Sequence, residues 1–582
     1  MRSSARPAVA SLIGAVCAAL VAATLPAALP AAAAETPQDV AEAAVAAADV
    51  DTVTRGTAAL AVLHLPATRT PMHGRGPTTF DFDGDGVDDL AVGAALGWVP
   101  EFEPLGRQPV GEVVVRYSSL DHDDVLMDLL PTSRNGGGVG FGLQLAGGDF
   151  DGDGYDDLVA TNVDDSYDGR DAHQQSGAVW VVPGSATGLD LQRARRITQA
   201  TPGVPGTAER GDWFGSALAT GDLNGDGFAD LAVGAWGESV GSRKQAGAVT
   251  VLLGGRGGIS GAGARTITQA TRGAPGTPEK NDEFGASLAI GRIDRDRYAD
   301  LVIGAPGENN PPGTTLTFCR ACTDGNGSIT VLHGSASGVT TSRAVSMGGA
   351  GLASRAAAAK AMPAGTMLWG VGGLLGVGDV DGDGYGDVLA PAPAAQVAGS
   401  RGATIGGAVV AVAGTRSGVD VSRVRVVTRG SSGVAGSPDD GFGESLAVGD
   451  LTGDGRADVV VGSGRDVGGR HDAGDVTVLR GAPGGLTGVS SSTFSQAGSI
   501  PGVPEPDEYF GRSVRILSTD GAGRPELVVS AEGETYASSP SVHGLFQTVA
   551  VGRSTVSPRS TLTAPSFLVP GLVDFVVYLT LG

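Results

Sequence analysis

The stretch Phe214-Gly215-Ser216-Ala217-Leu218-Ala219-Thr220-Gly221-Asp222-Leu223-Asn224-Gly225-Asp226-Gly227-Phe228-Ala229-Asp230-Leu231-Ala232-Val233-Gly234 decides the fold, because versions of it recur along the chain. Each version contains an apolar run that ends in Gly, an acidic nonapeptide and a second apolar run. The nonapeptides begin at residues 81, 149, 222, 292, 379, 450 and 518. A regular period of about 70 residues predicts a repeat architecture in which each repeat forms one structural unit.

Each repeat reads as about four β-strands. Short runs of branched residues bounded by Gly, such as Asp458–Gly462 and Gly247–Leu252, are typical of strands rather than helices. Four antiparallel strands repeated seven times predict an all-β, seven-bladed β-propeller over residues 56–582. A strand from one terminus must complete the ring, and residues 58–65 and 572–581 are both candidates.

The N-terminus has the pattern of a secretory signal. Arg2 and Arg6 precede an apolar run over residues 8–25, and small residues follow as far as Ala34. We therefore expect a signal peptide over 1–34, an Ala-rich leader over 35–55 and a secreted protein. A retained membrane anchor is disfavoured because Pro26 and Pro30 interrupt the run, and no later stretch is long and apolar enough to span a membrane.

Charge and cysteine content narrow the classes of partner. The formal net charge of −23 argues against nucleic acid as a partner, because nucleic acid binds basic surfaces.

In an exported protein, Cys319 and Cys322 are expected to form a disulfide that closes a four-residue loop. A zinc half-site would need a second ligand pair, and a redox site would need a βαβ context. Asn326 begins a sequon that matters only in a host that glycosylates.

The acidic nonapeptides have the donor spacing of a site for a hard cation. Oxygen-bearing side chains at loop positions 1, 3, 5 and 9, with a backbone carbonyl at position 7, supply an oxygen-only shell suited to Ca²⁺. Gly at positions 4 and 6 lets the backbone fold tightly around an ion. An acidic, Gly-rich turn without metal is the alternative.

Five loops keep an oxygen donor at every position, so we expect about five structural calcium sites. Three are complete, with four Asp side chains each: Asp81, Asp83, Asp85, Val87 and Asp89; Asp149, Asp151, Asp153, Tyr155 and Asp157; and Asp379, Asp381, Asp383, Tyr385 and Asp387. Two carry less charge and should bind more weakly: Asp222, Asn224, Asp226, Phe228 and Asp230; and Asp450, Thr452, Asp454, Arg456 and Asp458. The loops at 292 and 518 are expected to be empty. The first of them contains Arg292, Arg295 and Arg297, and a guanidinium is expected to replace the ion there.

The repeat resembles the FG-GAP repeat of integrin α-subunit propellers. Phe284-Gly285, the acidic loop after it and Gly304-Ala305-Pro306 carry the resemblance, which extends over residues 73–552. The Phe-Gly pair begins at 141, 214, 284, 442 and 510, whereas His73-Gly74 and Val371-Gly372 replace it in two blades. The resemblance implies a seven-bladed propeller with calcium in loops between strands and a ligand-binding face on the opposite side.

The long loops expected on that opposite face contain much of the aromatic content of the chain. Candidate ligand-face residues are Trp98, Phe102, Tyr167, His173, Trp236, Phe318 and Tyr536. Loops on a rigid scaffold are where such folds acquire binding function. We therefore expect a monomeric, secreted binding or adhesion module with an extracellular protein or glycan as its partner, and no enzymatic activity. The alternative is an extracellular polysaccharide lyase or hydrolase built on the propeller.

Overall fold

The computed structural model describes most of the chain from Asp49 onward. The described residues are 49–55, 58–66, 79–96, 111–128, 140–165, 175–308, 327–359, 366–397, 407–429, 431, 433–436, 441–498, 500–518, 525–536, 539–552, 555–563 and 577–581. The predicted signal peptide and the first part of the leader therefore lie outside the described residues, as do Cys319 and Cys322.

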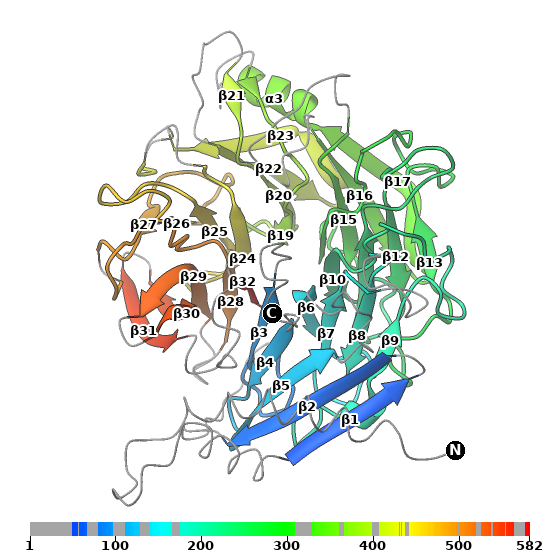
Figure 1. Cartoon of the computed structure of the whole chain (residues 1–582). Coiled ribbons are helices and arrows are strands. Elements are labelled where there is room, and N and C mark those ends of the chain that lie inside the picture. Colours follow the sequence, from blue (N-terminus) through cyan, green and yellow to red (C-terminus); the bar gives the residue numbers. More distant parts are fainter. Residues whose placement is uncertain are drawn as a thin grey trace, which may run out of the picture.

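The protein is a seven-bladed β-propeller, which confirms the predicted fold class. Seven antiparallel sheets, each with at least four strands, are arranged around the middle of the ring (Figure 1). The innermost strands, in blade order, are β32 (Val577–Leu581), β6 (Phe141–Gly148), β10 (Ala217–Gly221), β14 (Ser287–Gly291), β19 (Gly376–Gly378), β24 (Ser445–Gly449) and β28 (Val514–Leu517).

The other three strands of each blade follow outward from the axis. The second strands are β3 (Leu90–Leu96), β7 (Asp157–Asn162), β11 (Asp230–Ala235), β15 (Asp300–Ala305), β20 (Asp387–Ala392), β25 (Asp458–Ser463) and β29 (Glu526–Tyr536). The third strands are β4 (Glu112–Arg116), β8 (Ala178–Val182), β12 (Ala248–Leu252), β16 (Ser328–Ser335), β22 (Ala408–Thr415), β26 (Asp475–Leu479) and β30 (Ser539–Val551). The outer strands are β5 (His122–Asp128), β9 (Arg195–Ile197), β13 (Arg265–Ile267), β17 (Gly338–Gly348), β23 (Gly418–Thr428), β27 (Ser492–Phe494) and β31 (Val556–Thr563).

The two ends of the described chain meet in the first blade, which answers the question of ring closure. The C-terminal strand β32 pairs with β3 and supplies the innermost strand of that blade. The N-terminal candidate is used differently, because β2 (Ala58–Pro66) pairs with β5 at the outer edge. β1 (Asp49–Arg55) then pairs with β2. The last seven residues of the range predicted to be a leader are therefore a strand of blade 1.

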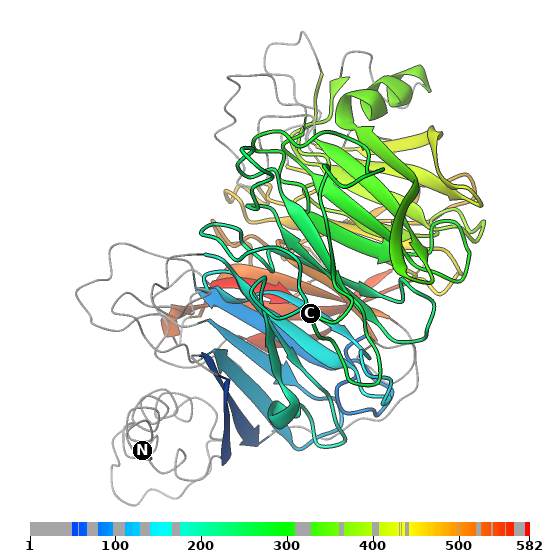
Figure 2. The ribbon, with the colours of Figure 1, turned by 90° about the vertical axis from the view of Figure 1, so that its right-hand side faces the viewer.

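Among the described residues, helical structure is sparse and lies outside the sheets. The α-helix α3 (Gly349–Ala358) contacts β17 and β23 at the outer edge of blades 4 and 5, as Figures 1 and 2 show. The short helix η2 (Leu191–Arg193) precedes β9. A two-stranded pairing joins β18 (Thr366–Met367) to β21 (Gln396–Val397) beside blade 5.

In the blades that contain it, the Phe-Gly pair packs the blade against the one before it. Phe284 of blade 4 is 1% exposed and belongs to one buried cluster with Val249 and Val251 of blade 3. Its N–H donates to the carbonyl oxygen of Ala246 at 3.0 Å, and Gly247 lies so close that a Cβ there would collide with the backbone of Phe284. Only Gly permits this approach, because the φ of Gly247 is also +84°.

A second set of contacts joins the acidic loops around the ring. The N–H at loop position 8 donates to the carbonyl oxygen at position 1 of the preceding loop, over 2.8–3.0 Å. The pairs are Asp156 with Asp81, Ala229 with Asp149, Ala299 with Asp222, Gly386 with Arg292, Ala457 with Asp379, and Asp88 with Ser518. Position 8 of the last loop is Pro525, which has no N–H, so the corresponding bond cannot form between blades 6 and 7.

The antiparallel order divides the loops between two faces. In blades 2 to 7 the acidic loops connect the first and second strands, and in blade 1 the acidic loop directly precedes the second strand, β3. The connections between third and fourth strands therefore share the face of the acidic loops. The connections between second and third strands lie on the opposite face, together with those that lead from one blade to the next. The scaffold therefore separates the candidate calcium loops from the candidate ligand face.

The close approach at Gly247 can be tested by substitution. Gly247→Ala places a methyl group against the backbone of Phe284 at a positive φ, so we expect a loss of roughly 2–4 kcal/mol of stability. The matched control is Gly257→Ala, where a Cβ would have no neighbour within 4 Å. Thermal unfolding of the two variants measures the difference, and equal melting temperatures would contradict the packing role of the Phe-Gly pair.

Candidate functional site

The first residue of each intact acidic loop holds the loop together through its own backbone. In the loop at 81, Oδ1 of Asp81 accepts the N–H of Asp85 at 2.9 Å and Oδ2 accepts the N–H of Gly86 at 2.8 Å. Asp379 accepts the N–H groups of Asp383 and Gly384 in the same way, at 3.1 and 2.7 Å. The first carboxylate thus fixes the tight turn in which the other donors are presented.

The ninth residue ties the loop to the third strand of its own blade. One oxygen of Asp230 accepts the N–H of Leu223 at 2.9 Å, and the other accepts the N–H of Gly254 at 2.9 Å. Asp387 has the same two kinds of partner, Val380 at 3.0 Å and Gly414 at 2.9 Å. These carboxylates are buried, so the geometry of position 9 is set by the sheet.

Burial makes several of the ninth carboxylates hard to ionise when no cation is near, among them Asp157, Asp230 and Asp387. Desolvation is the main cause that raises the pKa of Asp157 to about 8, of Asp230 to about 7 and of Asp387 to about 6. It raises the pKa of Asp89 well above its ordinary value, and the charges of neighbouring Asp residues add to the shift. A bound cation would relieve both penalties.

Three loops bring carboxylate oxygen atoms close enough to share one ion. The oxygens lie within 4.8 Å of one another in each group, and the groups are Asp81, Asp83 and Asp85; Asp149, Asp151 and Asp153; and Asp379, Asp381 and Asp387. Calcium–oxygen bonds of about 2.3–2.6 Å place ligand atoms at most about 5 Å apart, so the spacing fits Ca²⁺. Oδ1 of Asp151 is also buried without a hydrogen-bond partner among the described residues, which leaves an oxygen free for an ion.

The loops at 222 and 450 are less complete. Nδ2 of Asn224 donates to Asp226 at 2.8 Å, and Nη2 of Arg456 pairs with Asp454 at 2.6 Å. Within the described part of these loops, three carboxylates do not come within the distance found in the other three. Weaker ion binding by these two loops stays a prediction.

Arginines from the neighbouring hairpins reach two of the complete loops. Arg193, at the end of η2, pairs with Asp151 and lies 3.3 Å from Asp153. Arg423 in β23 lies 2.9 Å from Asp381 in the same arrangement. These ion pairs connect the outer hairpin of a blade to its acidic loop and were not foreseen from the sequence.

The guanidinium beside the acidic loop at 292 does not come from the loop itself. Arg292, Arg295 and Arg297 are exposed, so none of these three side chains takes the place expected for a guanidinium. The positively charged group beside Asp294 is instead Arg343 of β17, at 3.2 Å. Of the loop at 518, residues 519–524 lie outside the described residues, and its predicted state stays untested.

The opposite face is described for only part of the predicted set. Trp98, Phe102, Tyr167, His173 and Phe318 lie outside the described residues, and Tyr536 ends β29. Trp236 is half-buried and stacks on Trp213, with ring centroids 5.4 Å apart and an angle of 28° between the rings. Trp213 was not among the residues predicted for the ligand face. Its position directly before the Phe-Gly pair at 214 could have placed it on that face.

Backbone strain accompanies the tryptophan pair. Trp213 has a φ of +58°, which side-chain-bearing residues rarely adopt. Glu283 and Tyr509, which also precede a Phe-Gly pair, have φ values of +58° and +56°. The turn therefore belongs to the repeat, whereas the two tryptophan side chains are particular to blade 3.

Among the described residues, none of the helices has the length and apolar character needed to cross a membrane.

Comparison with protein families finds FG-GAP repeats in this chain. The FG-GAP repeat matches residues 141–182, 214–252, 284–332 and 442–479. These are the regions of blades 2, 3, 4 and 6 that contain the Phe-Gly pair and the first three strands. The sequence-based recognition of the repeat is confirmed.

Curated relatives are integrin α chains. Integrin alpha-5 of Xenopus laevis is 30% identical over 243 residues, which are 41% of this chain and 20% of the relative. Integrin alpha-PS2 of Drosophila melanogaster is 33% identical over 240 residues, which are 39% of this chain and 15% of the relative. Integrin alpha pat-2 of Caenorhabditis elegans is 32% identical, over 40% of this chain and 18% of the relative. The chain thus spans about a fifth of the length of these relatives.

Similar solved structures correct the expectation that the chain is not an enzyme. They include the rhamnogalacturonan lyases YesX and YesW, with TM-scores of 0.28 and 0.31, sequence identities of 12% and 13%, and coverage of 89% and 88% of this chain. The matches cover 73% and 75% of those chains. Because enzymes are among the similar structures, the exclusion of catalysis does not stand. TM-scores this low carry no argument for a lyase reaction, and we assign none.

The raised pKa values predict how pH acts on the calcium-free protein. Asp157, Asp230 and Asp387 hold protons more tightly when folded than when unfolded, where the pKa of Asp is about 3.9. Folding is therefore favoured at low pH, and this stability is lost as pH rises through about 6 to 8. We expect a lower melting temperature at pH 8 than at pH 5 in calcium-free buffer, and a smaller or reversed difference in excess Ca²⁺. A melting temperature of the calcium-free protein that increases with pH would contradict this.

Proposed function

We propose that the protein is a secreted, calcium-stabilised propeller that binds an extracellular protein or glycan through the face opposite its acidic loops. The observation that carries the proposal is the difference between the two faces. One face repeats the same acidic loop around the ring, whereas the other carries irregular loops and, in blade 3, a stacked pair of tryptophans. Secretion rests on the signal-like N-terminus of the sequence.

The donor sets support Ca²⁺ as the ion. In the complete loops, the side chains of positions 1, 3, 5 and 9 would hold it, assisted by the carbonyl oxygen of position 7. The ion would supply positive charge where several buried carboxylates meet, and it would pin the turn between the first and second strands. Similarity to integrin α chains favours this assignment.

The repetition of the loops supports a stabilising role for these ions. Each carboxylate cluster is positioned by equivalent backbone groups in several blades, so the clusters are nearly alike. If each loop binds Ca²⁺ with a dissociation constant of about 10⁻⁴–10⁻³ M, then at roughly millimolar calcium each site would add about 0.4–1.4 kcal/mol to the free energy of unfolding. Five such sites would supply a few kcal/mol, which is comparable with the net stability of a domain.

The tryptophan pair supports a binding role for the opposite face. Trp213 and Trp236 are half-buried, so part of each ring remains accessible, and their stacking fixes them in one orientation. Trp213 is further held by its N–H, which donates to the carbonyl oxygen of Gln175 at 3.0 Å. Rigid aromatic rings supply contact area at a small cost in conformational entropy, which is why they are enriched in binding surfaces.

Calcium binding can be measured loop by loop. Asp383→Asn removes a charged ligand from a complete loop and should remove one binding equivalent in a calorimetric titration. The matched control is Asp296→Asn, which changes position 5 of the loop at 292, where calcium is not expected. Calcium should raise the melting temperature of the unsubstituted protein. An unchanged melting temperature, or an equal loss in both variants, would contradict the assignment.

Binding by the opposite face can be measured with a double variant. Trp213→Ala with Trp236→Ala should abolish binding to the glycan or cell-surface protein captured by the unsubstituted chain. Val489→Ala is the control, because this valine is 62% exposed and lies between β26 and β27 on the face of the acidic loops. A glycan array and a calcium-containing pull-down distinguish the two classes of partner. Binding that survives in the double variant would remove the tryptophan pair from the proposal.

A further inference from the structure

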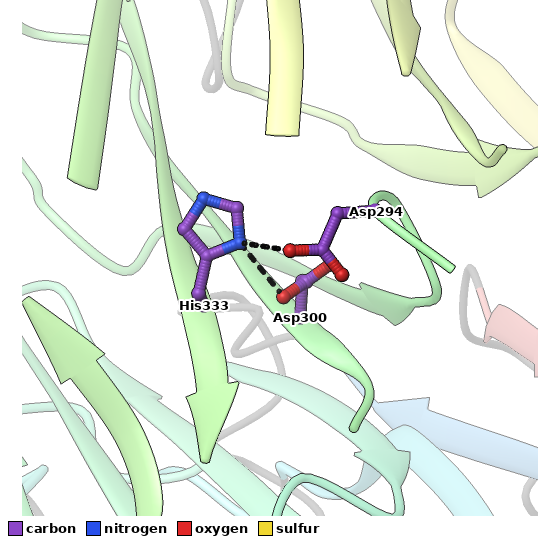
Figure 3. Close-up of side chains that lie close together, drawn as sticks. All are labelled: Asp294, Asp300 and His333. Carbon is purple, nitrogen blue, oxygen red and sulfur yellow. Dashed lines mark hydrogen bonds and ion pairs between the residues drawn. The ribbon is translucent and has the colours of Figure 1, made fainter. Parts of the chain in front are cut away.

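His333 is near the end of β16 and turns its imidazole toward the acidic loop of blade 4 (Figure 3). Its Nδ1 atom lies 3.3 Å from Oδ2 of Asp294 and 3.1 Å from Oδ1 of Asp300. The side chains of these three residues are only 1–3% exposed. One nitrogen and two carboxylate oxygens therefore converge in a place that is shielded from solvent.

This loop departs from the calcium pattern while keeping part of its donor set. Asp294 and Asp300 occupy positions 3 and 9, the same places as Asp381 and Asp387 in blade 5. Position 1 is the exposed Arg292, so the carboxylate that organises the other loops is missing. Ca²⁺ needs six to eight oxygen ligands, which this loop no longer offers.

The imidazole is held in a slot that recurs in the propeller. In several blades, one backbone N–H donates to the carboxylate at loop position 9. In the three clearest cases, the residue just before that N–H packs against a Gly of the next blade, and the pairs are Tyr117 with Gly188, Leu253 with Gly338, and His333 with Gly418. A Cβ at Gly418 would strike the ring edge that carries Nε2, so this edge faces the neighbouring blade. Nδ1 is thereby fixed toward the two carboxylates before any ligand arrives, as a built site requires.

We propose that His333, Asp294 and Asp300 form a site for one divalent ion of the zinc class, distinct from the oxygen-only loops of the other blades. Zinc–ligand bonds of about 2.0–2.2 Å in a tetrahedral shell place neighbouring ligand atoms about 3.3–3.6 Å apart. The distances from Nδ1 of His333 to the two carboxylate oxygens, 3.1 and 3.3 Å, are close to this range. An imidazole nitrogen with two carboxylates suits Zn²⁺, Co²⁺ or Ni²⁺ and disfavours Ca²⁺.

The charge of the cluster matches a divalent ion. Two ionised carboxylates and a neutral imidazole carry two negative charges, which one such ion neutralises. Binding requires Nδ1 to be unprotonated, so any proton there is released to solvent as the metal–nitrogen bond forms. Nη2 of Arg343 lies 3.2 Å from Oδ2 of Asp294 and orients that carboxylate from outside the metal shell. Arg343 is 51% exposed, so solvent approaches the cluster beside it.

The test uses the full chain, freed of metal with a chelator and returned to millimolar Ca²⁺ so that the oxygen-only loops are saturated. Zn²⁺ is then titrated by calorimetry, and Co²⁺ by its visible absorption. We expect one tight equivalent and an intense Co²⁺ spectrum typical of a low-coordinate site. His333→Leu, which installs the residue found in this place in blade 3, should lose both signals.

Two further variants keep the result interpretable. Asp294→Asn should also lose the tight equivalent, whereas His471→Gln should keep it, because His471 is 72% exposed in a separate acidic cluster. A calcium-dependent melting transition confirms that each variant is folded. The proposal is overturned if the unsubstituted protein binds no Zn²⁺ beyond the exposed cluster, or if His333→Leu retains the tight site.

Discussion

The hydrogen bond from loop position 8 to the carbonyl oxygen at position 1 of the preceding loop connects the blades on one face of the propeller. It occurs at six junctions, including the one between the last and first blades, where Asp88 donates to Ser518. The donor and the acceptor both belong to acidic loops. The shape of one loop therefore constrains the next, and a cation that orders one loop also orders the junction beside it. Pro525 has no N–H to donate at the seventh junction, so blades 6 and 7 lack this hydrogen bond.

The Phe-Gly pair makes the corresponding contact within the core. The Phe side chain fills the space between two sheets, and its backbone lies against a Gly that opens the third strand of the preceding blade. Apolar packing and the loop hydrogen bonds thus act on the same pair of blades at different places. With these contacts in place, the connections on the opposite face are free to vary in length and composition. This is the physical basis for placing recognition there.

Much of the architecture follows from the sequence, because a repeat reports the same structure many times. The spacing located the blades, the acidic loops and the Phe-Gly pairs, whereas the contacts of these pairs with the preceding blade emerged from the structure. Ring closure was left open because residues 58–65 and 572–581 are both apolar, and apolarity does not distinguish an inner strand from an outer one. In the structure both ends join blade 1, β32 on the inside and β2 on the outside.

The parts that the sequence did not predict depend on contacts between distant residues. Arg193 and Arg423 reach acidic loops from about 42 positions further along the chain, a separation that only the folded hairpins make short. In the sequence, nothing distinguishes His333 from other strand residues. Only the folded structure places it beside Asp294 and Asp300. A guanidinium was expected in the loop at 292 because charge complementarity was judged along the chain. The arginines of that loop are exposed, and the guanidinium beside Asp294 is that of Arg343, from another strand.

Cations bound in the acidic loops would lock the blades together on one face. Amide hydrogen exchange of the position-8 N–H groups measures this coupling, and the groups to follow are those of Asp156, Ala229, Ala299, Gly386 and Ala457. We expect Ca²⁺ to slow exchange at these amides much more than at the amides of the second strands, which are buried in either state. Equal protection of the position-8 amides with calcium and with a chelator would contradict it.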